Sequence, residues 1–157
     1  MAEISVLAEG YVASLEGGRL RASPSAVLIE DARNRVLVDP GADERGLLSG
    51  LSRKGLSSED VDLIFVTHSH LDHILNLRLF PETDVCDSGF IYRGDEEIPY
   101  GKFVPGTEIE VLPTPRSHPG SRVPSGSGRR QNLACGRRPI LVARRCRPED
   151  RLSLIHI

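Results

Sequence analysis

Residues 63–73 read Leu-Ile-Phe-Val-Thr-His-Ser-His-Leu-Asp-His, and this stretch decides the fold of the chain. Its first four residues form an apolar run that is typical of a strand buried on both faces of a sheet. Three histidines and one aspartate follow within six residues: His68, His70, Asp72 and His73. Side chains two residues apart in extended backbone point the same way, which places His68 and His70 on one side. Imidazole and carboxylate groups bind Zn²⁺ and similar ions, so the stretch predicts a metal site, with a solvated histidine-rich turn as the alternative.

Regular elements on both sides of this loop predict a layered α/β protein. Short apolar runs rich in β-branched residues predict strands at 4–8, 26–30, 35–38, 61–66 and 108–112. The segment 43–54 has leucines at helical spacing, acids at its start and bases at its end, and Gly55 follows as a C-terminal cap. It therefore predicts a helix. Residues 73–80 predict a second, short helix that Pro81 ends.

The 157 residues divide into two unlike parts near Pro115. Residues 1–115 hold 10 Lys and Arg against 20 Asp and Glu, a net charge of −10. Residues 116–157 hold 10 arginines, no lysine and two acids, a net charge of +8. All seven aromatic residues lie at or before Phe103. We therefore expect one domain over 1–115 and a separate arginine-rich tail over 116–157.

The same composition favours a cytoplasmic protein without a membrane partner. No apolar run approaches the ~18 residues that a membrane-spanning helix needs. The N-terminus carries Glu3 where a signal peptide is positively charged. The cysteines Cys86, Cys135 and Cys146 predict neither an even disulfide framework nor a close-spaced zinc pair. We interpret Cys86 as a small apolar core residue.

The pattern of residues 68–73, His-x-His-x-Asp-His, resembles the signature of the metallo-β-lactamase fold. Members of that fold are mostly hydrolases that use one or two bound metal ions. Val36 to Gly41 resembles the strand and Asp-x-Gly turn upstream in the fold, and Glu108 to Pro115 resembles a later strand followed by Thr-Pro. The resemblance spans about residues 4–115 and implies the N-terminal half of an αββα sandwich, followed by a non-native or disordered C-terminal tail.

Two further segments are similar to one branch of this superfamily. They are the run Asn-Leu-Arg-Leu-Phe-Pro at 76–81 and the Glu-Gly-Tyr at 9–11. The branch is called metallo-β-lactamase domain-containing protein 1, and it is associated with nuclease activity on RNA. The resemblance thus implies an RNA phosphodiester as one substrate.

The resemblance also implies a role for each candidate residue. His68 and His70 would bind a first metal ion, and Asp72 and His73 a second. Asp72 would in addition act catalytically by taking up a proton. Asp39 would brace the loop through hydrogen bonds, although on its residues alone it is equally well a capped turn. One or two Zn²⁺ ions are expected, with Mn or Fe as alternatives, and they would lower the pKa of bound water from 15.7 toward about 7.

The family pattern breaks after Pro115. In the family, Gly-His follows Thr-Pro and this histidine completes the first metal site, whereas this chain reads Arg-Ser-His-Pro at 116–119. One extra nucleotide converts codons for Gly-His-Thr-Pro into codons for Arg-Ser-His-Pro. We therefore expect the residues from Arg116 onward not to be the native continuation, with a genuine disordered basic tail as the alternative. Sequencing the source gene through codon 116 separates the two. His118 is either a displaced ligand of the first metal or an exposed loop histidine.

Three functions remain open. The first is a metal-dependent hydrolase using metal-activated water, with RNA as the substrate that the branch resemblance suggests. The second is hydrolysis of a small thioester or lactone, as in glyoxalase-II-like members, which the charge of −10 over residues 1–115 favours over RNA. The third is a non-enzymatic RNA-binding module that uses the arginine-rich tail. Intact relatives could form a homodimer, which the sequence does not decide.

Overall fold

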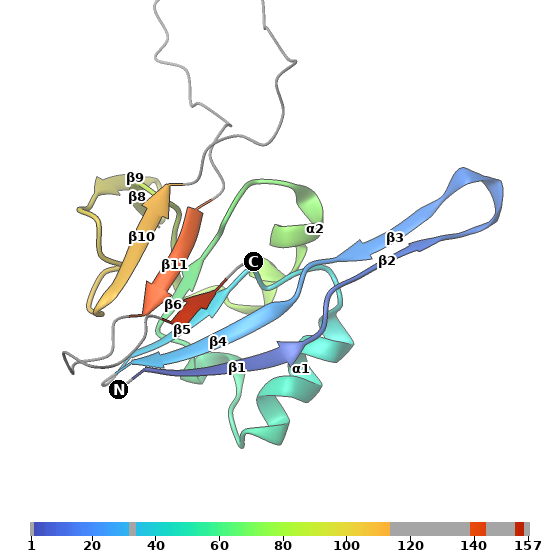
Figure 1. Ribbon diagram of the computed structural model, residues 1–157, viewed down its shortest axis with the longest axis horizontal. Coiled ribbons are helices and arrows are strands. Elements are labelled where there is room, and N and C mark those ends of the chain that lie inside the picture. Colours follow the sequence, from blue (N-terminus) through green and yellow to red (C-terminus); the bar gives the residue numbers. More distant parts are fainter. Residues whose placement is uncertain (1, 32–33, 114–138, 144–152, 156–157) are drawn as a thin grey trace, which may run out of the picture.

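The computed structural model describes residues 2–31, 34–113, 139–143 and 153–155, and it has a layered architecture of helices and two sheets (Figure 1). The central layer is a seven-stranded mixed sheet. Its strands, in spatial order, are β1 (Glu3–Ala8), β4 (Ala26–Asp31), β5 (Asn34–Val38), β6 (Leu63–Phe65), β7 (Asp84–Cys86), β8 (Phe90–Arg93) and β9 (Glu96–Pro99). The pairs β5–β6 and β6–β7 are parallel, and the other neighbours are antiparallel.

Helices cover one face of this sheet. They are α1 (Glu44–Arg53), α2 (Leu71–Ile74) and the 3-10 turns η2 (Ser58–Asp60) and η3 (Leu75–Leu79). Leu47 and Leu51 of α1 pack in one buried cluster with sheet residues that include Leu28 and Ile64. The helix lies so close to β1 that a Cβ at Gly50 would collide with the backbone of Leu7. This close approach requires glycine there.

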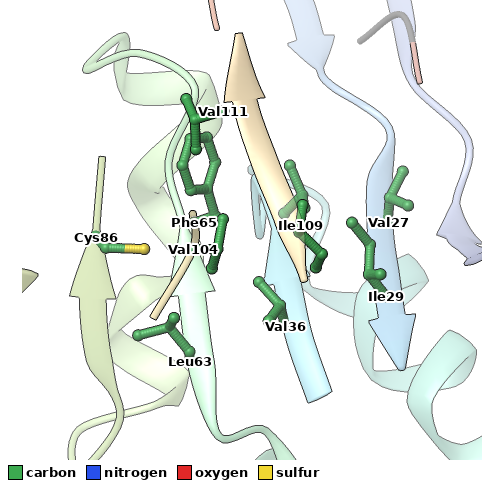
Figure 2. Packing of buried hydrophobic residues seen from close by; sticks show 10 residues of the cluster. Val27, Ile29, Val36, Leu63, Phe65, Cys86, Val104, Ile109 and Val111 are labelled. Carbon is green, nitrogen blue, oxygen red and sulfur yellow. The ribbon is translucent and has the colours of Figure 1, made fainter. Parts of the chain in front are cut away.

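The opposite face of the sheet packs against a second, three-stranded sheet. That sheet has the order β10 (Ile109–Pro113), β11 (Pro139–Ala143) and β12 (Ser153–Ile155). Figure 2 shows Ile109 and Val111 lying over Val36 and Phe65 of the large sheet. Successive side chains of β6 thus enter different cores, because Leu63 and Phe65 belong to this cluster and Ile64 to the helix-side cluster. A strand buried on both faces is what its apolar sequence predicts.

A two-stranded hairpin projects from the body of the molecule (Figure 1). It consists of β2 (Tyr11–Ser14) and β3 (Leu20–Ser23), joined through the short 3-10 turn η1 (Glu16–Gly18). Val12 is 79% exposed and Leu20 67%. This hairpin was not predicted from the sequence, because its strands contact the core little and so lack a clear alternating pattern.

The described elements agree with the layered α/β prediction. All five predicted strands and the 43–54 helix are present, with Asp43 as the N-terminal cap. The short helix begins earlier than predicted: α2 starts at Leu71 and η3 ends at Leu79, before Pro81. The order helix, sheet, sheet forms three layers of the expected αββα sandwich.

The arginine-rich tail contributes two described strands, where the sequence analysis predicted a non-native or disordered segment. β11 holds the apolar residues Pro-Ile-Leu-Val-Ala of 139–143, and it pairs with β10 and β12. Short apolar β-branched runs favour strands in any reading frame, so this pairing leaves the origin of the segment open. The break itself, at Arg116, lies outside the described residues. The helices of the described residues all fall short of the length and apolar character needed to traverse a bilayer.

Candidate metal centre

Three histidine rings gather in the loop at residues 67–73, directly after β6. His70 is exposed, while His68 and His73 are partly buried. The first turn of α2 directs the backbone N–H of His73 to the carbonyl of His70, at 3.0 Å. This turn folds His73 back onto His68, with ring centroids 3.9 Å apart, and the rings of His68 and His70 are 4.6 Å apart. The loop therefore forms an imidazole cluster at the end of a central parallel strand.

Asp39 lies beneath this cluster at the end of β5. Its side chain is fully buried, and its φ of 47° makes it the one left-handed non-glycine residue in the described part of the chain. Its backbone N–H donates to the carbonyl of Phe65 at 3.0 Å, which ties the ends of β5 and β6 together. Its Oδ1 accepts from the backbone N–H of Thr67 at 2.9 Å, and its Oδ2 accepts from the Thr67 hydroxyl at 2.6 Å. Strain of this kind is stored where the surroundings fix the conformation.

The same carboxylate also contacts the far end of the loop. Oδ2 of Asp39 lies 2.9 Å from Nδ1 of His73, whose side chain is 14% exposed. The direction of the ring N–H does not meet hydrogen-bond geometry, so Nδ1 is buried without a regular hydrogen bond. Asp39 thus contacts both ends of the loop.

The turn after Asp39 holds α2 in place. The backbone N–H of Gly41 donates to the carbonyl of His73 at 3.1 Å, and the carbonyl of Gly41 accepts from the N–H of Asn76 at 3.0 Å. The buried Asn76 side chain donates to the carbonyl of Pro40 at 3.1 Å. Gly41 has a φ of 76°, which glycine adopts without strain. These bonds fix His73 relative to Asp39.

The candidate ligands fit a divalent ion by the chemistry of their donors. Three imidazoles and the Asp72 carboxylate meet in one loop, and Oδ2 of Asp72 lies 3.9 Å from Nε2 of His73. Within the described ranges, however, no three His, Cys, Asp or Glu side chains converge on one point. His70 is exposed and the Asp72 side chain is 39% exposed, so both can rotate toward an ion. His118 lies outside the described residues.

Sequence reasoning missed Thr67 and Asn76 as parts of this site. Thr67 stands between the strand and the first histidine, and its buried hydroxyl lies 2.6 Å from Asp39 and 3.0 Å from Nδ1 of His68. The position of Thr67, a hydroxyl residue directly after the apolar run of residues 63–66, could have indicated a polar contact there. Cys86 is confirmed as a core residue, and burial together with nearby Asp87 raises the pKa of its thiol to about 12. It packs in the core cluster between the two sheets and not in the loop at residues 67–73.

Comparison with known proteins adds to this geometry. The family model described as the metallo-beta-lactamase superfamily matches residues 20–131. The chain belongs to the metallo-β-lactamase superfamily. The match extends past Pro115, where the sequence analysis placed a boundary.

Individual relatives of the superfamily include the predicted branch. Metallo-β-lactamase domain-containing protein 1 of Mus musculus is 36% identical over 126 residues, which cover 72% of this chain and 44% of that protein. The protein of the same name from Xenopus laevis is 33% identical over 131 residues, covering 76% and 54%. A subclass B3 metallo-β-lactamase from a soil metagenome library has a TM-score of 0.49 and 18% identity, covering 97% of this chain and 61% of that one. The predicted resemblance is confirmed, and the chain spans about half the length of the curated relatives it matches.

Proposed function

We propose that this chain carries the metal-binding loop of a metal-dependent hydrolase. The observation that carries the proposal is the cluster of three imidazoles at the end of β6, contacted from below by the buried carboxylate of Asp39. His68 and His70 would hold a first divalent ion, most simply Zn²⁺, and a third ligand would come from later in the chain. Asp72 and His73 would hold a second ion. A divalent ion in this position supplies activated water and polarises the bond to be cleaved.

The residues of the chain itself divide the remaining tasks. Asp39 and the Gly41 turn hold the loop in position, because their bonds connect two strands and α2. Asp72 is the acceptor for a proton during turnover, since its carboxylate is partly exposed and lies beside the imidazole of His73. His70 is at the surface and is available to substrate as well as to an ion.

An RNA phosphodiester is the first candidate substrate, suggested by the resemblance of residues 9–11 and 76–81 to a branch associated with nuclease activity on RNA. A small thioester or lactone is the second, supported by the net charge of −10 over residues 1–115. An RNA-binding surface usually carries basic side chains that neutralise phosphates, and this part of the chain lacks such an excess. The arginine-rich tail, with its charge of +8, could serve that purpose in a non-enzymatic RNA-binding module.

Metal content is the first test. The purified chain is dialysed against limiting Zn²⁺ and analysed by mass spectrometry of the metal, together with the double variant His68→Ala/His70→Ala. Ser69→Ala is the matched control, because Ser69 is exposed between the two histidines. We expect the wild type and the control to bind more Zn²⁺ than the double variant, which lacks both histidines of the first site. Equal metal content in all three would contradict the proposal.

Activity is the second test, with labelled RNA and S-lactoylglutathione assayed in parallel. The assays use the chain as printed and the protein encoded by the source gene after resequencing through codon 116. Turnover of either substrate that is lost on chelation and restored by Zn²⁺ supports the hydrolase. RNA binding that survives chelation and the double variant, with no turnover of either substrate, would instead support the binding module.

A further inference from the structure

We propose that Ser23 is a positioning residue for the second proposed ion. It lies at the base of the β2–β3 hairpin, and its hydroxyl holds the turn at residues 40–43, to which α2 and its ligand His73 are bonded. The inference deepens the proposed function and rests on it, because an effect on an ion requires that His73 binds one. Ser23 is assigned no bond to the metal itself.

Strand β3 exposes its leucine and buries its serine. Leu20 lies mostly in solvent, whereas Ser23 is 6% exposed and is the one buried residue of this strand. A buried polar side chain in a hairpin that otherwise projects into solvent is informative, because burial of a polar group costs free energy unless the group is hydrogen-bonded. The hydroxyl of Ser23 therefore requires partners in the body of the molecule.

Those partners are two successive backbone groups at the start of α1. Oγ of Ser23 accepts from the N–H of Ala42 at 3.1 Å and from the N–H of Asp43 at 3.2 Å. A hydroxyl oxygen has two lone pairs, and these two bonds use both of them. The hydroxyl proton makes only a long contact, 3.4 Å, with the carbonyl of Pro24. Ser23 thus acts on the turn as an acceptor, and an alanine side chain cannot take this role.

The N–H group that precedes these two belongs to Gly41, and it holds α2. It donates to the carbonyl of His73 at 3.1 Å, so three consecutive N–H groups of one turn connect Ser23 with the backbone of the candidate ligand. The contact is close, since a Cβ at Gly41 would lie 2.8 Å from Oγ of Ser23. Figure 1 shows the base of the hairpin beside α2. A shift of the turn away from Ser23 would therefore be transmitted to His73.

The base of the hairpin is itself fixed, which allows Ser23 to hold the turn. The N–H of Gly10 donates to the hydroxyl of Ser25 at 2.9 Å. A Cβ at Gly10 would lie 2.7 Å from the backbone nitrogen of Ser25, so the two ends of the hairpin approach each other closely. Pro24 in addition restricts the backbone of Ser23 to extended conformations. Ser25 thus fixes the hairpin, whereas Ser23 connects it to the turn.

Four variants distinguish positioning of His73 from a general contribution to the fold. Ser23→Ala removes the acceptor of both N–H groups, and Ser23→Thr keeps a hydroxyl at the same position. Ser25→Ala is the matched control, because it removes a serine hydroxyl from the same end of the hairpin. Asp43→Ala removes the side chain that caps α1 by accepting from the N–H of Gly46 at 3.0 Å, and it leaves the hydroxyl of Ser23 in place.

The first measurement is amide hydrogen exchange of the metal-free full chain. In the wild type, the N–H groups of Ala42 and Asp43 should be protected, and unprotected exchange there overturns the proposal whether or not any variant folds. In Ser23→Ala, exchange at Gly41 should become roughly 10-fold faster relative to exchange in β6. Ser25→Ala and Asp43→Ala should leave this ratio as in the wild type. Equal acceleration at Gly41 and in β6 would show a general loss of stability and overturn the proposal.

The second measurement is a zinc titration of the same variants, followed by ¹H–¹⁵N spectra of the histidine side chains. Ser23→Ala should weaken binding at His73 about 10-fold, the lower end of the loss when a group that orients a ligand is removed, and Ser23→Thr should restore it. Binding at His68 should not change. A purely structural role of Ser23 would weaken binding at both histidines alike, and Asp43→Ala would reproduce it.

Failure of the inference and failure of the proposed function give different results. A wild-type chain that binds no zinc, but shows the expected exchange rates, refutes the proposed function and leaves the connection from Ser23 to His73 standing. Zinc binding at His73 that Ser23→Ala leaves unchanged refutes the positioning role and leaves the function standing.

Discussion

The inner and outer halves of the histidine loop are held in different ways. On the inner side, His68 and His73 contact the buried Asp39–Thr67 pair through their Nδ1 atoms. On the outer side, His70 is exposed and Asp72 has a side chain that is 39% exposed. The inner pair contacts buried groups at the ends of strands β5 and β6, whereas the outer pair lies toward solvent.

This difference indicates which ligand side chains are held in place in the absence of a metal ion. Each proposed ion has one inner ligand, His68 or His73, and one outer ligand, His70 or Asp72. The inner ligands already have their rings oriented by buried groups, so they lose little conformational freedom on binding. The outer ligands are ordered by the ion itself. Changes on the inner side should therefore affect the fold, and changes on the outer side only the ion.

The largest expected effect comes from breaking the inner side with Asp39→Ala. This change leaves the hydroxyl and the buried backbone N–H of Thr67 without their acceptor, and each such loss costs ~1–3 kcal/mol. We expect a loss of about 3 kcal/mol in the free energy of unfolding, measured by urea denaturation with chelator present. Asp72→Ala, on the outer side, should stay within about 0.5 kcal/mol of the wild type under the same conditions. Equal destabilisation by the two variants would mean that the inner and outer sides do not differ.

Local pattern was sufficient to predict the ligands but not what holds them. His68, His70, Asp72 and His73 follow a recognisable apolar strand without interruption, so strand and loop could be identified together from residues 63–73. The contact between Asp39 and Thr67 joins residues 28 positions apart. It depends on the parallel register in which Val38 pairs with Phe65. The sequence pattern of each strand alone does not determine how the two strands pair, so this contact could not be predicted from it.

The less buried parts of the fold were also harder to predict. Strands with two buried faces, such as β6, have a continuous apolar sequence, and this sequence predicts a buried strand. The β2–β3 hairpin buries little, and Val12 and Leu20 remain mostly exposed, so burial left no pattern in its sequence. Strand β11 was not predicted, because the arginine-rich composition of residues 116–157 suggested a tail rather than a strand.

The next largest effect is stabilisation of the folded chain by zinc. It distinguishes the outer ligand His70 from the inner ligand His68. An ion at 100 times its dissociation constant adds about 2.7 kcal/mol to the stability of the folded chain. We expect His70→Ala to retain the metal-free unfolding midpoint of the wild type and to lose most of the zinc-dependent shift. His68→Ala should lower the metal-free midpoint as well, because it leaves the Thr67 hydroxyl without its second partner. A thermal melt with and without zinc measures both quantities, and Ser69→Ala should behave as the wild type does.

The smallest expected effect comes from an ion pair outside the histidine loop. It tests whether a change in the stability of the fold alone alters zinc binding. Lys54 lies 2.5 Å from Glu30 and 3.0 Å from Glu3, with 24% of its side chain exposed. Its hydrogen bond lowers the pKa of Glu30 below 4.5, and Glu30 in turn raises the pKa of Lys54 above 10.5. The Glu30 contribution is therefore present above pH 4.5 and lost as the pH falls through the lowered pKa, while the Lys54 contribution is lost as the pH rises through the raised one.

Glu30→Gln should consequently lower the free energy of unfolding by about 1 kcal/mol at neutral pH, the upper range for a partly exposed ion pair. The difference from the wild type should shrink as the pH falls through the lowered pKa of Glu30, because the wild-type carboxyl is then protonated as well. Urea denaturation at a series of pH values measures this convergence. Zinc affinity should not change, since the ion-pair partners of Glu30, Lys54 and Arg35, lie outside the histidine loop. A Glu30→Gln variant that bound zinc more weakly than the wild type would show that general loss of stability also weakens metal binding.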